Sequence, residues 1–217
     1  LYILSLLLLT CPALVAGLSD AEKAMVDEVA AVFLKTECDS GKLFECGLLG
    51  TREKQLGRIG EAKRLYKKAC DGGEISNCGS LGIVEHELGN KAEAKRLLKK
   101  ACDSGEESYC VNLGQIENQL GNIAEAKRLL KKSCEIGNII GCIELGRIEF
   151  KLGNEYAAKD LFKKACDAGD NEGCMLLGVS ELLLKNYKSA RKILNKACDN
   201  GSNKACKMLS DMAKAEL

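Results

Sequence analysis

Apolar residues recur along the chain at the spacing of amphipathic α-helices, with short polar interruptions between them. Within residues 108–120 the apolar positions lie four and three residues apart, which places them on one face of a helix. These positions are Tyr109, Leu113, Ile116 and Leu120. Gly121 and Asn122 then end this helix, and the pattern predicts a second helix from about Ile123.

The second predicted helix is amphipathic as well. Its inward positions are Ala126, Leu129, Leu130 and Ser133, and its outward positions are Lys127, Arg128, Lys131 and Lys132. The basic last turn complements the negative end of the helix dipole. Glu125 can pair with Arg128 three residues on. The lysines of the second helices are interpreted as a solubilising outer surface.

This helix–turn–helix unit repeats every 32 residues. The recurring positions are the Leu-Gly pairs at 49–50, 81–82, 113–114, 145–146 and 177–178, the glycines at 57, 89, 121 and 153, and the alanines at 62, 94, 126, 158 and 190. A fixed period of this kind is typical of stacked repeats that bury a continuous core. The expected fold is all-α: an αα-hairpin repeat solenoid with about eleven short helices after a longer helix over residues 20–36.

Twelve of the 13 cysteines follow the same period, as pairs eight residues apart. The pairs are Cys38 and Cys46, Cys70 and Cys78, Cys102 and Cys110, Cys134 and Cys142, Cys166 and Cys174, and Cys198 and Cys206. On one continuous helix the two Cα atoms would be ~12 Å apart, whereas a disulfide needs ~4.4 to 6.8 Å.

A glycine follows the first cysteine of each pair by three residues, at positions 41, 73, 105, 137, 169 and 201. There a left-handed cap can end the helix and turn the chain back, which brings the two cysteines together. One structural disulfide per repeat is favoured, with metal binding and redox-active thiols as alternatives. Zinc sites prefer closer cysteines with histidine partners, and His86 is the single histidine, so no metal and no cofactor are expected.

Charge is balanced, with 32 Lys and Arg residues against 31 Asp and Glu residues. The net charge of the chain therefore does not attract nucleic acid or an acidic membrane surface. A charged partner would have to be recognised by a local group of residues.

Residues 1–17, LYILSLLLLTCPALVAG, are typical of a secretory signal peptide that has lost its start and is cleaved after Gly17. A membrane anchor and a lipoprotein signal at Cys11 are the alternatives. Cleavage removes Cys11 and leaves an even set of cysteines, as expected of an exported, oxidised protein. The predicted location is secreted or periplasmic, in a bacterium, with no stable membrane span in the mature form.

Units that read LG, LGN, EAKRLLKKAC and DxGxxxxC resemble the Sel1-like repeat family, and within it the Hcp-type cysteine-rich proteins that bacteria export. The resemblance covers nearly all of residues 36–217. It implies a right-handed superhelix related to tetratricopeptide repeats, with one disulfide per repeat and a concave face lined by the first helices. The expected organisation is an N-terminal capping helix over residues 18–37, then five 32-residue repeats and a C-terminal capping helix over residues 38–217. A unit of 32 residues is shorter than the usual Sel1-like unit.

Residues that differ between repeats at equivalent positions of the first helices can determine which ligand binds. In a tetratricopeptide register, the predicted groove consists of Thr51, Lys54, His86, Gln115, Asn118, Gln119, Arg147, Phe150 and Lys151, with Gln55, Glu87, Val179, Leu182 and Leu183 beside them. This surface suits an extended peptide, a glycan fragment or a protein partner. Asn118 and Gln119 would supply hydrogen bonds, and Arg147 or Lys151 would hold a carboxylate. The alternative is a set of solvated helix faces.

The Hcp-type resemblance also carries a β-lactamase or penicillin-binding designation. Ser189 and Lys192 form a Ser-x-x-Lys motif, but neither Ser-Asp-Asn nor Lys-Thr-Gly occurs, so no catalytic residue is assigned. The favoured function is an exported, disulfide-stapled scaffold that binds a peptide, cell-wall fragment or protein and not nucleic acid. A β-lactam-binding protein or weak β-lactamase is the alternative.

Overall fold

The computed structural model describes residues 19–214, which form helices and no strands. The helices are α3 (Asp20–Asp39), α4 (Leu43–Gln55), α5 (Ile59–Asp71), α6 (Ile75–Glu87), α7 (Lys91–Asp103), α8 (Glu107–Gln119), α9 (Ile123–Glu135), α10 (Ile139–Lys151), α11 (Glu155–Asp167), α12 (Asn171–Leu183), α13 (Tyr187–Asp199) and α14 (Asn203–Lys214). The predicted fold class, an all-α repeat solenoid with a long first helix, is confirmed. The predicted signal peptide lies outside the described residues. Within residues 19–214, no helix is both long and apolar enough to cross a membrane.

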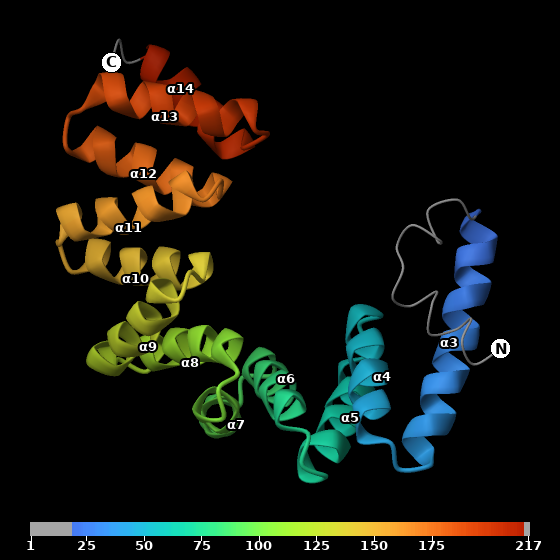
Figure 1. The fold of residues 1–217 in the computed structure, drawn as a ribbon. Coiled ribbons are helices and arrows are strands. Elements are labelled where there is room, and N and C mark those ends of the chain that lie inside the picture. The colour runs from blue at the N-terminus through green and yellow to red at the C-terminus, as the bar shows by residue number, and fades with distance from the viewer. Residues whose placement is uncertain (1–18, 215–217) are drawn as a thin grey trace. The chain divides into compact units, whose positions relative to one another are not determined.

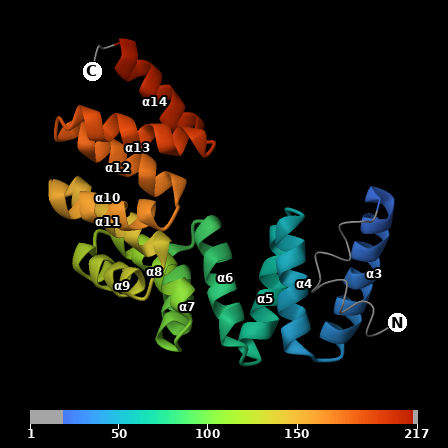
Figure 2. The ribbon, with the colours of Figure 1, turned by 45° about the horizontal axis from the view of Figure 1, so that its top comes forward.

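The helices belong to two compact units, residues 1–104 and residues 105–217. In unit 1, α3 packs on α4, and the hairpins α4–α5 and α6–α7 pack through α5 and α6. In unit 2, the hairpins α8–α9, α10–α11 and α12–α13 stack in order, and α14 packs on α13. Figures 1 and 2 show the two helices of each hairpin lying side by side.

The two helices of a hairpin approach closely at the glycine of each Leu-Gly pair. A Cβ atom added at Gly146 of α10 would lie 2.6 Å from Cε1 of Phe162 in α11. At the equivalent position of the next hairpin, a Cβ on Gly178 would lie 2.6 Å from the Leu194 side chain. Because neither contact leaves room for a side chain, the recurring glycine is explained by packing.

Every second helix ends at the predicted glycine cap. Gly137 has a φ of 93°, and its N–H donates to the carbonyl of Cys134 at 3.1 Å. The N–H of Asn138 donates to the carbonyl of Ser133 at 2.9 Å, which completes a Schellman-type cap. The turns inside the hairpins use a second left-handed position, occupied by glycine at 57, 89, 121 and 153 and by Lys185, with a φ of 61°, in the last hairpin.

The chain reversal at these caps brings the paired cysteines together, as predicted. The Cα atoms of Cys134 and Cys142 are 4.5 Å apart and their sulfur atoms are bonded. The pairs 38–46, 70–78, 166–174 and 198–206 are bonded in the same way. Cys102 and Cys110 are disulfide-bonded as well. The predicted disulfide in each repeat is therefore confirmed.

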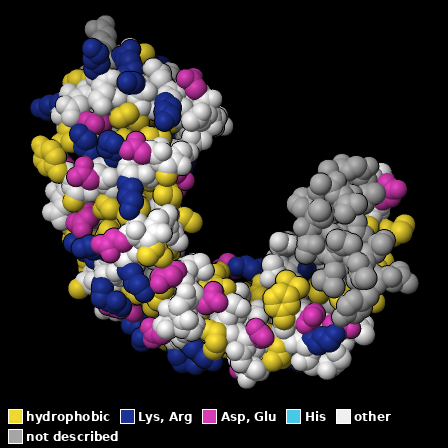
Figure 3. Space-filling model, in the orientation of Figure 1, with side chains coloured by type: hydrophobic (Ala, Val, Ile, Leu, Met, Phe, Trp, Pro, Cys, Tyr) yellow, Lys and Arg dark blue, Asp and Glu magenta, His cyan; other side chains and the backbone are white. Residues whose placement is uncertain are grey.

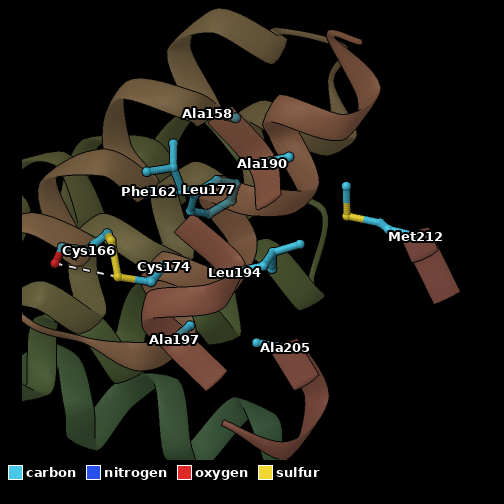
Figure 4. Packing of buried hydrophobic residues seen from close by; sticks show 10 residues of the cluster. All are labelled: Ala158, Phe162, Cys166, Cys174, Leu177, Ala190, Leu194, Ala197, Ala205 and Met212. Atoms are coloured by element: carbon cyan, nitrogen blue, oxygen red, sulfur yellow. Dashed lines mark hydrogen bonds between the residues drawn. A yellow bond between two sulfur atoms is a disulfide. The ribbon is translucent and has the colours of Figure 1, made fainter. Parts of the chain in front are cut away.

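Apolar residues and half-cystines share the core of each unit. Figure 4 shows the cluster at the C-terminal end of unit 2, where Phe162, Leu177 and Leu194 pack with the disulfide of Cys166 and Cys174. The inward positions predicted for α9, namely Ala126, Leu129, Leu130 and Ser133, are all buried. Leu120 departs from the predicted stripe, because it caps the end of α8 at the hairpin turn and is 44% exposed.

Candidate functional site

A pocket of about 230 Å³ lies among four helices of unit 2. Its lining comprises Asn118 of α8, Glu144, Arg147, Phe150 and Lys151 of α10, Phe162 of α11, and Leu176 and Val179 of α12. Three of these helices are the first helices of successive hairpins. The lining therefore combines four apolar side chains with four polar or charged side chains.

Helical spacing explains why α10 contributes most of the lining. Glu144, Arg147 and Lys151 are three and four residues apart, so they share one face of the helix. Leu176 and Val179 of α12 are likewise three residues apart. Phe162 belongs to the buried core and reaches the pocket from α11. The apolar wall is thus held by the same packing that holds the repeat stack.

Four of the nine predicted groove residues come together in this pocket: Asn118, Arg147, Phe150 and Lys151. Val179, which was placed beside them, lines it too. Gln115 and Gln119 lie on the same helix as Asn118, with Gln115 half-buried and Gln119 exposed. Neither of them lines the pocket, and neither do Leu182 and Leu183 of α12.

The predicted residues of unit 1 are engaged with each other and with their neighbours. The Nζ of Lys54 lies 2.7 Å from Oε1 of Glu87, so the charges of these two groove positions are paired. The hydroxyl of Thr51 accepts a hydrogen bond from the Tyr66 hydroxyl at 3.0 Å and donates to the carbonyl of Gly47 at 3.1 Å. His86 is half-buried.

Arg147 is held by carboxylates on both sides. Its guanidinium group donates to Glu172 of α12, and Oε1 of Glu144 lies 3.8 Å from its Nε. That Nε is buried and has no hydrogen-bond acceptor among the described residues. The arginine is thereby fixed across the pocket between α10 and α12, with one donor still unused.

Lys151 differs from Arg147 in its surroundings. It is exposed at the C-terminal end of α10, and its ammonium group forms no hydrogen bond or ion pair with the described part of the chain. An exposed cation beside the apolar ring of Phe150 can accept an anionic group without first breaking an internal pair. Of the two predicted carboxylate-binding residues, Lys151 is the available one.

Each first helix also carries a buried glutamate that the sequence analysis missed. These residues are Glu53, Glu85, Glu117, Glu149 and Glu181, and they recur with the period of 32. Oε2 of Glu149 accepts a hydrogen bond from Nδ2 of Asn154 at 2.7 Å, and Oε1 lies 2.7 Å from Nζ of Lys127. Burial raises the pKa of Glu149, but these hydrogen bonds outweigh it and the pKa lies below its ordinary value. Because one of these glutamates occurs in every repeat, we interpret them as part of the structural framework of the repeats.

The Ser-x-x-Lys motif lies at the start of α13, with Ser189 half-buried. The Ser189 hydroxyl is hydrogen-bonded to the buried carboxylate of Glu181. This contact ties the serine to the glutamate of its own hairpin.

Solved structures with similar folds come from several repeat proteins. A protective antigen present in uropathogenic Escherichia coli strains, which displays an SLR fold, matches with a TM-score of 0.70 and 22% identity. The match covers 84% of this chain and 44% of the antigen. A Sel1 repeat protein from Oxalobacter formigenes matches with a TM-score of 0.67 and 20% identity, over 84% of this chain and 83% of that one. YrrB, a tetratricopeptide repeat protein with an unusual peptide-binding site, matches with a TM-score of 0.61 and 20% identity, over 86% of this chain and 100% of YrrB.

At these identities the structural likenesses establish the fold alone. Among curated protein sequences, none matches the chain. A tetratricopeptide repeat model matches residues 107–136. The family model of the Sel1 repeat matches residues 41–74, 77–106, 142–170 and 172–202. Because the Sel1 matches cover more than half of its length, the chain belongs to the Sel1 repeat family.

Proposed function

We propose that the protein binds a peptide segment of a protein partner at the pocket of unit 2. An apolar side chain of the peptide enters the pocket, and a carboxylate of the same peptide pairs with Lys151. The observation that carries this proposal is the grouping of Asn118, Arg147, Phe150 and Lys151 around a cavity with an apolar wall.

The size of the pocket favours a single side chain over a whole small molecule. Sites for drug-sized ligands enclose ~300 to 1,000 Å³, and this pocket encloses about 230 Å³. Phe150, Phe162, Leu176 and Val179 provide apolar surface for an aliphatic or aromatic group. Burying such a group contributes ~1.5 to 3 kcal/mol, which is the scale of an anchor residue in a peptide complex.

The charged residues of the pocket determine where a carboxylate of the peptide can bind. Arg147 is already engaged by Glu144 and Glu172, so a ligand carboxylate at its guanidinium group would compete with two internal ones. Lys151 has no such competitor among the described residues. The amide of Asn118 can bond the peptide backbone, which fixes its direction across α8, α10 and α12.

Two further findings support a role in protein binding outside the cytoplasm. The fold resembles YrrB, whose description names a peptide-binding site. Disulfides in every repeat are typical of oxidising compartments, so the scaffold is expected to work after export. The β-lactam alternative has no observation in its favour, and it is not proposed.

The proposal is tested by panning a phage-displayed random peptide library on the oxidised full chain. Enriched peptides are expected to share an apolar residue followed or preceded by Asp or Glu. They should lose at least ~10-fold in affinity for Lys151→Glu and for Phe150→Ala, since removal of either interaction costs ~1.4 kcal/mol or more.

The matched control is Lys207→Glu, which makes the same charge change at an exposed position of α14. It should bind the enriched peptides as the wild-type protein does. Absence of enrichment, or peptides that bind Lys151→Glu and Phe150→Ala unchanged, would exclude the pocket as a peptide site.

A further inference from the structure

Positive charge is concentrated at the C-terminal end of unit 2. From Lys185 to Lys207 the sequence has seven Lys or Arg residues and one acidic residue, Asp199, although the whole chain has 32 against 31. Figure 3 shows Lys and Arg side chains gathered over α13 and α14 at the top of the view. The balanced total charge therefore hides a local basic surface.

In α13, Lys192 lacks the acidic partner that the equivalent cation of α9 has. In α9, Arg128 pairs with Glu125 at 2.7 Å, and in α11, Lys163 pairs with Asp167. The positions equivalent to Glu125 and Arg128 are Ser189 and Lys192 in α13, so Lys192 lacks the glutamate that Arg128 has. The position equivalent to Lys163 is Asn195, whereas the equivalent of Asp167 is still an aspartate, Asp199.

The side chains of four lysines in this region have no hydrogen-bond or ion-pair partner within residues 19–214. They are Lys185, Lys188, Lys192 and Lys196. Since surface cations elsewhere on the second helices are mostly compensated, these four retain their charge for an external anion.

Apolar side chains lie near the N-terminal end of α13, around the turn that follows α12. Two open depressions on this surface share Tyr187, Lys188 and Lys192 in their linings, and Arg191 lines one of them. Leu183, at the end of α12 just before the turn, is 53% exposed, and Tyr187 is 37% exposed. The equivalents of Leu183 in the other hairpins are Gln55, Glu87, Gln119 and Lys151, so an exposed leucine here is particular to the last hairpin.

We propose that this basic surface of α13 docks on a membrane that contains anionic lipids. Clustered lysines on one helix face are attracted to an anionic leaflet, and tyrosine and leucine enter the headgroup region beside them. The cations are spread along the helix, which matches an extended charged plane better than a single bound anion. A nucleic acid backbone would match the charge, but it would leave Leu183 without a role.

The test is co-sedimentation of the oxidised full chain with vesicles. Vesicles of phosphatidylcholine with about one third phosphatidylglycerol are compared with vesicles of phosphatidylcholine alone, which report binding that does not depend on charge. Binding to the anionic vesicles is expected to exceed binding to the neutral ones, and to weaken as salt is raised to about 0.5 M.

Charge-reversal variants test whether binding depends on this surface or only on the net charge of the protein. Lys188→Glu combined with Lys192→Glu should lower partitioning into anionic vesicles by roughly 25-fold or more. The matched control, Arg128→Glu combined with Lys131→Glu on α9, makes the same change in net charge and should bind nearly as the wild-type protein does. Equal loss in both variants, equal binding to both kinds of vesicle, or binding to a single-stranded oligonucleotide without vesicle binding would overturn the proposal.

Discussion

Glu149 of α10 and Lys127 of α9 form a salt bridge across two successive hairpins, with Oε1 and Nζ 2.7 Å apart and the glutamate 8% exposed. The same relationship joins Lys159 of α11 to Glu181 of α12 at 3.0 Å. In unit 1 it joins Lys63 of α5 to Glu85 of α6 at 2.9 Å. Neighbouring hairpins are therefore linked by a recurring ion pair between a buried glutamate and a partly exposed lysine, as well as by apolar packing.

Glu149→Gln is expected to lower the free energy of unfolding by about 2 kcal/mol, because it removes charged hydrogen bonds from a buried position. Urea unfolding followed by circular dichroism measures the loss. Glu135→Gln, at an exposed position paired weakly with Lys131 at 3.9 Å, is the control and should change stability by less than ~0.5 kcal/mol. Equal effects of the two substitutions would show that the buried pair is not a structural link.

Acid should destabilise the fold through the same glutamates. Burial raises the pKa values of Glu149 and Glu181, but hydrogen bonds from Asn and Lys side chains lower them further, below the ordinary value of 4.5. Their contribution is fully present above that unfolded-state pKa, and it is lost as the pH falls through the lower folded-state pKa. Urea midpoints should therefore fall steadily below a pH of about 4.5. Glu149→Gln should show a shallower fall, and a pH profile identical to wild type would contradict this assignment.

The disulfides are expected to stabilise each repeat individually. Replacing Cys134 and Cys142 together by serine should lower the free energy of unfolding by about 2.5 kcal/mol, the chain-entropy value for a loop of this size. Thermal unfolding measures the change. In dithiothreitol the difference between this variant and the wild-type protein should shrink, because both then lack the bond. A wild-type melting temperature that reduction leaves unchanged would contradict the role of the disulfides in stability.

Lys185 occupies a left-handed position that glycine occupies in four of the five hairpins. Lys185→Gly is expected to raise the free energy of unfolding by about 0.5 to 1 kcal/mol, since a side chain is strained there. Lys188→Gly, in an exposed position within α13, should instead lower it by about 1 kcal/mol. The two single variants are compared by urea unfolding, and a loss of stability in Lys185→Gly would show that the lysine side chain compensates its strain.

The repeat period was enough to predict the hairpins, their glycine caps and the disulfides, because each depends on residues within one unit. Leu120 was misassigned because helical spacing does not show that α8 ends at Gln119, which leaves Leu120 as an exposed cap residue at the hairpin turn. The buried glutamates were missed because a recurring charged residue resembles a solvated surface. Glu149 becomes recognisable only when its partner Lys127, 22 positions earlier, is brought beside it.

The pocket was predicted in part. The register on the Leu-Gly pairs placed Asn118, Arg147, Phe150 and Lys151 on one surface, since equivalent positions of stacked first helices face the same way. It could not show that Glu172, 25 residues along the chain, engages Arg147, or that Phe162 of a second helix forms the wall. Both depend on how side chains of different hairpins fill the space between them.

The proposed binding of a peptide by unit 2 is tested most directly by methyl NMR of the oxidised protein titrated with a peptide selected by panning. The account predicts that the methyl resonances of Leu176 and Val179 shift on addition of the peptide, whereas those of Leu81 and Val84 in unit 1 stay in place. Shifts confined to unit 1, or none at Leu176 and Val179 at saturating peptide, would contradict it.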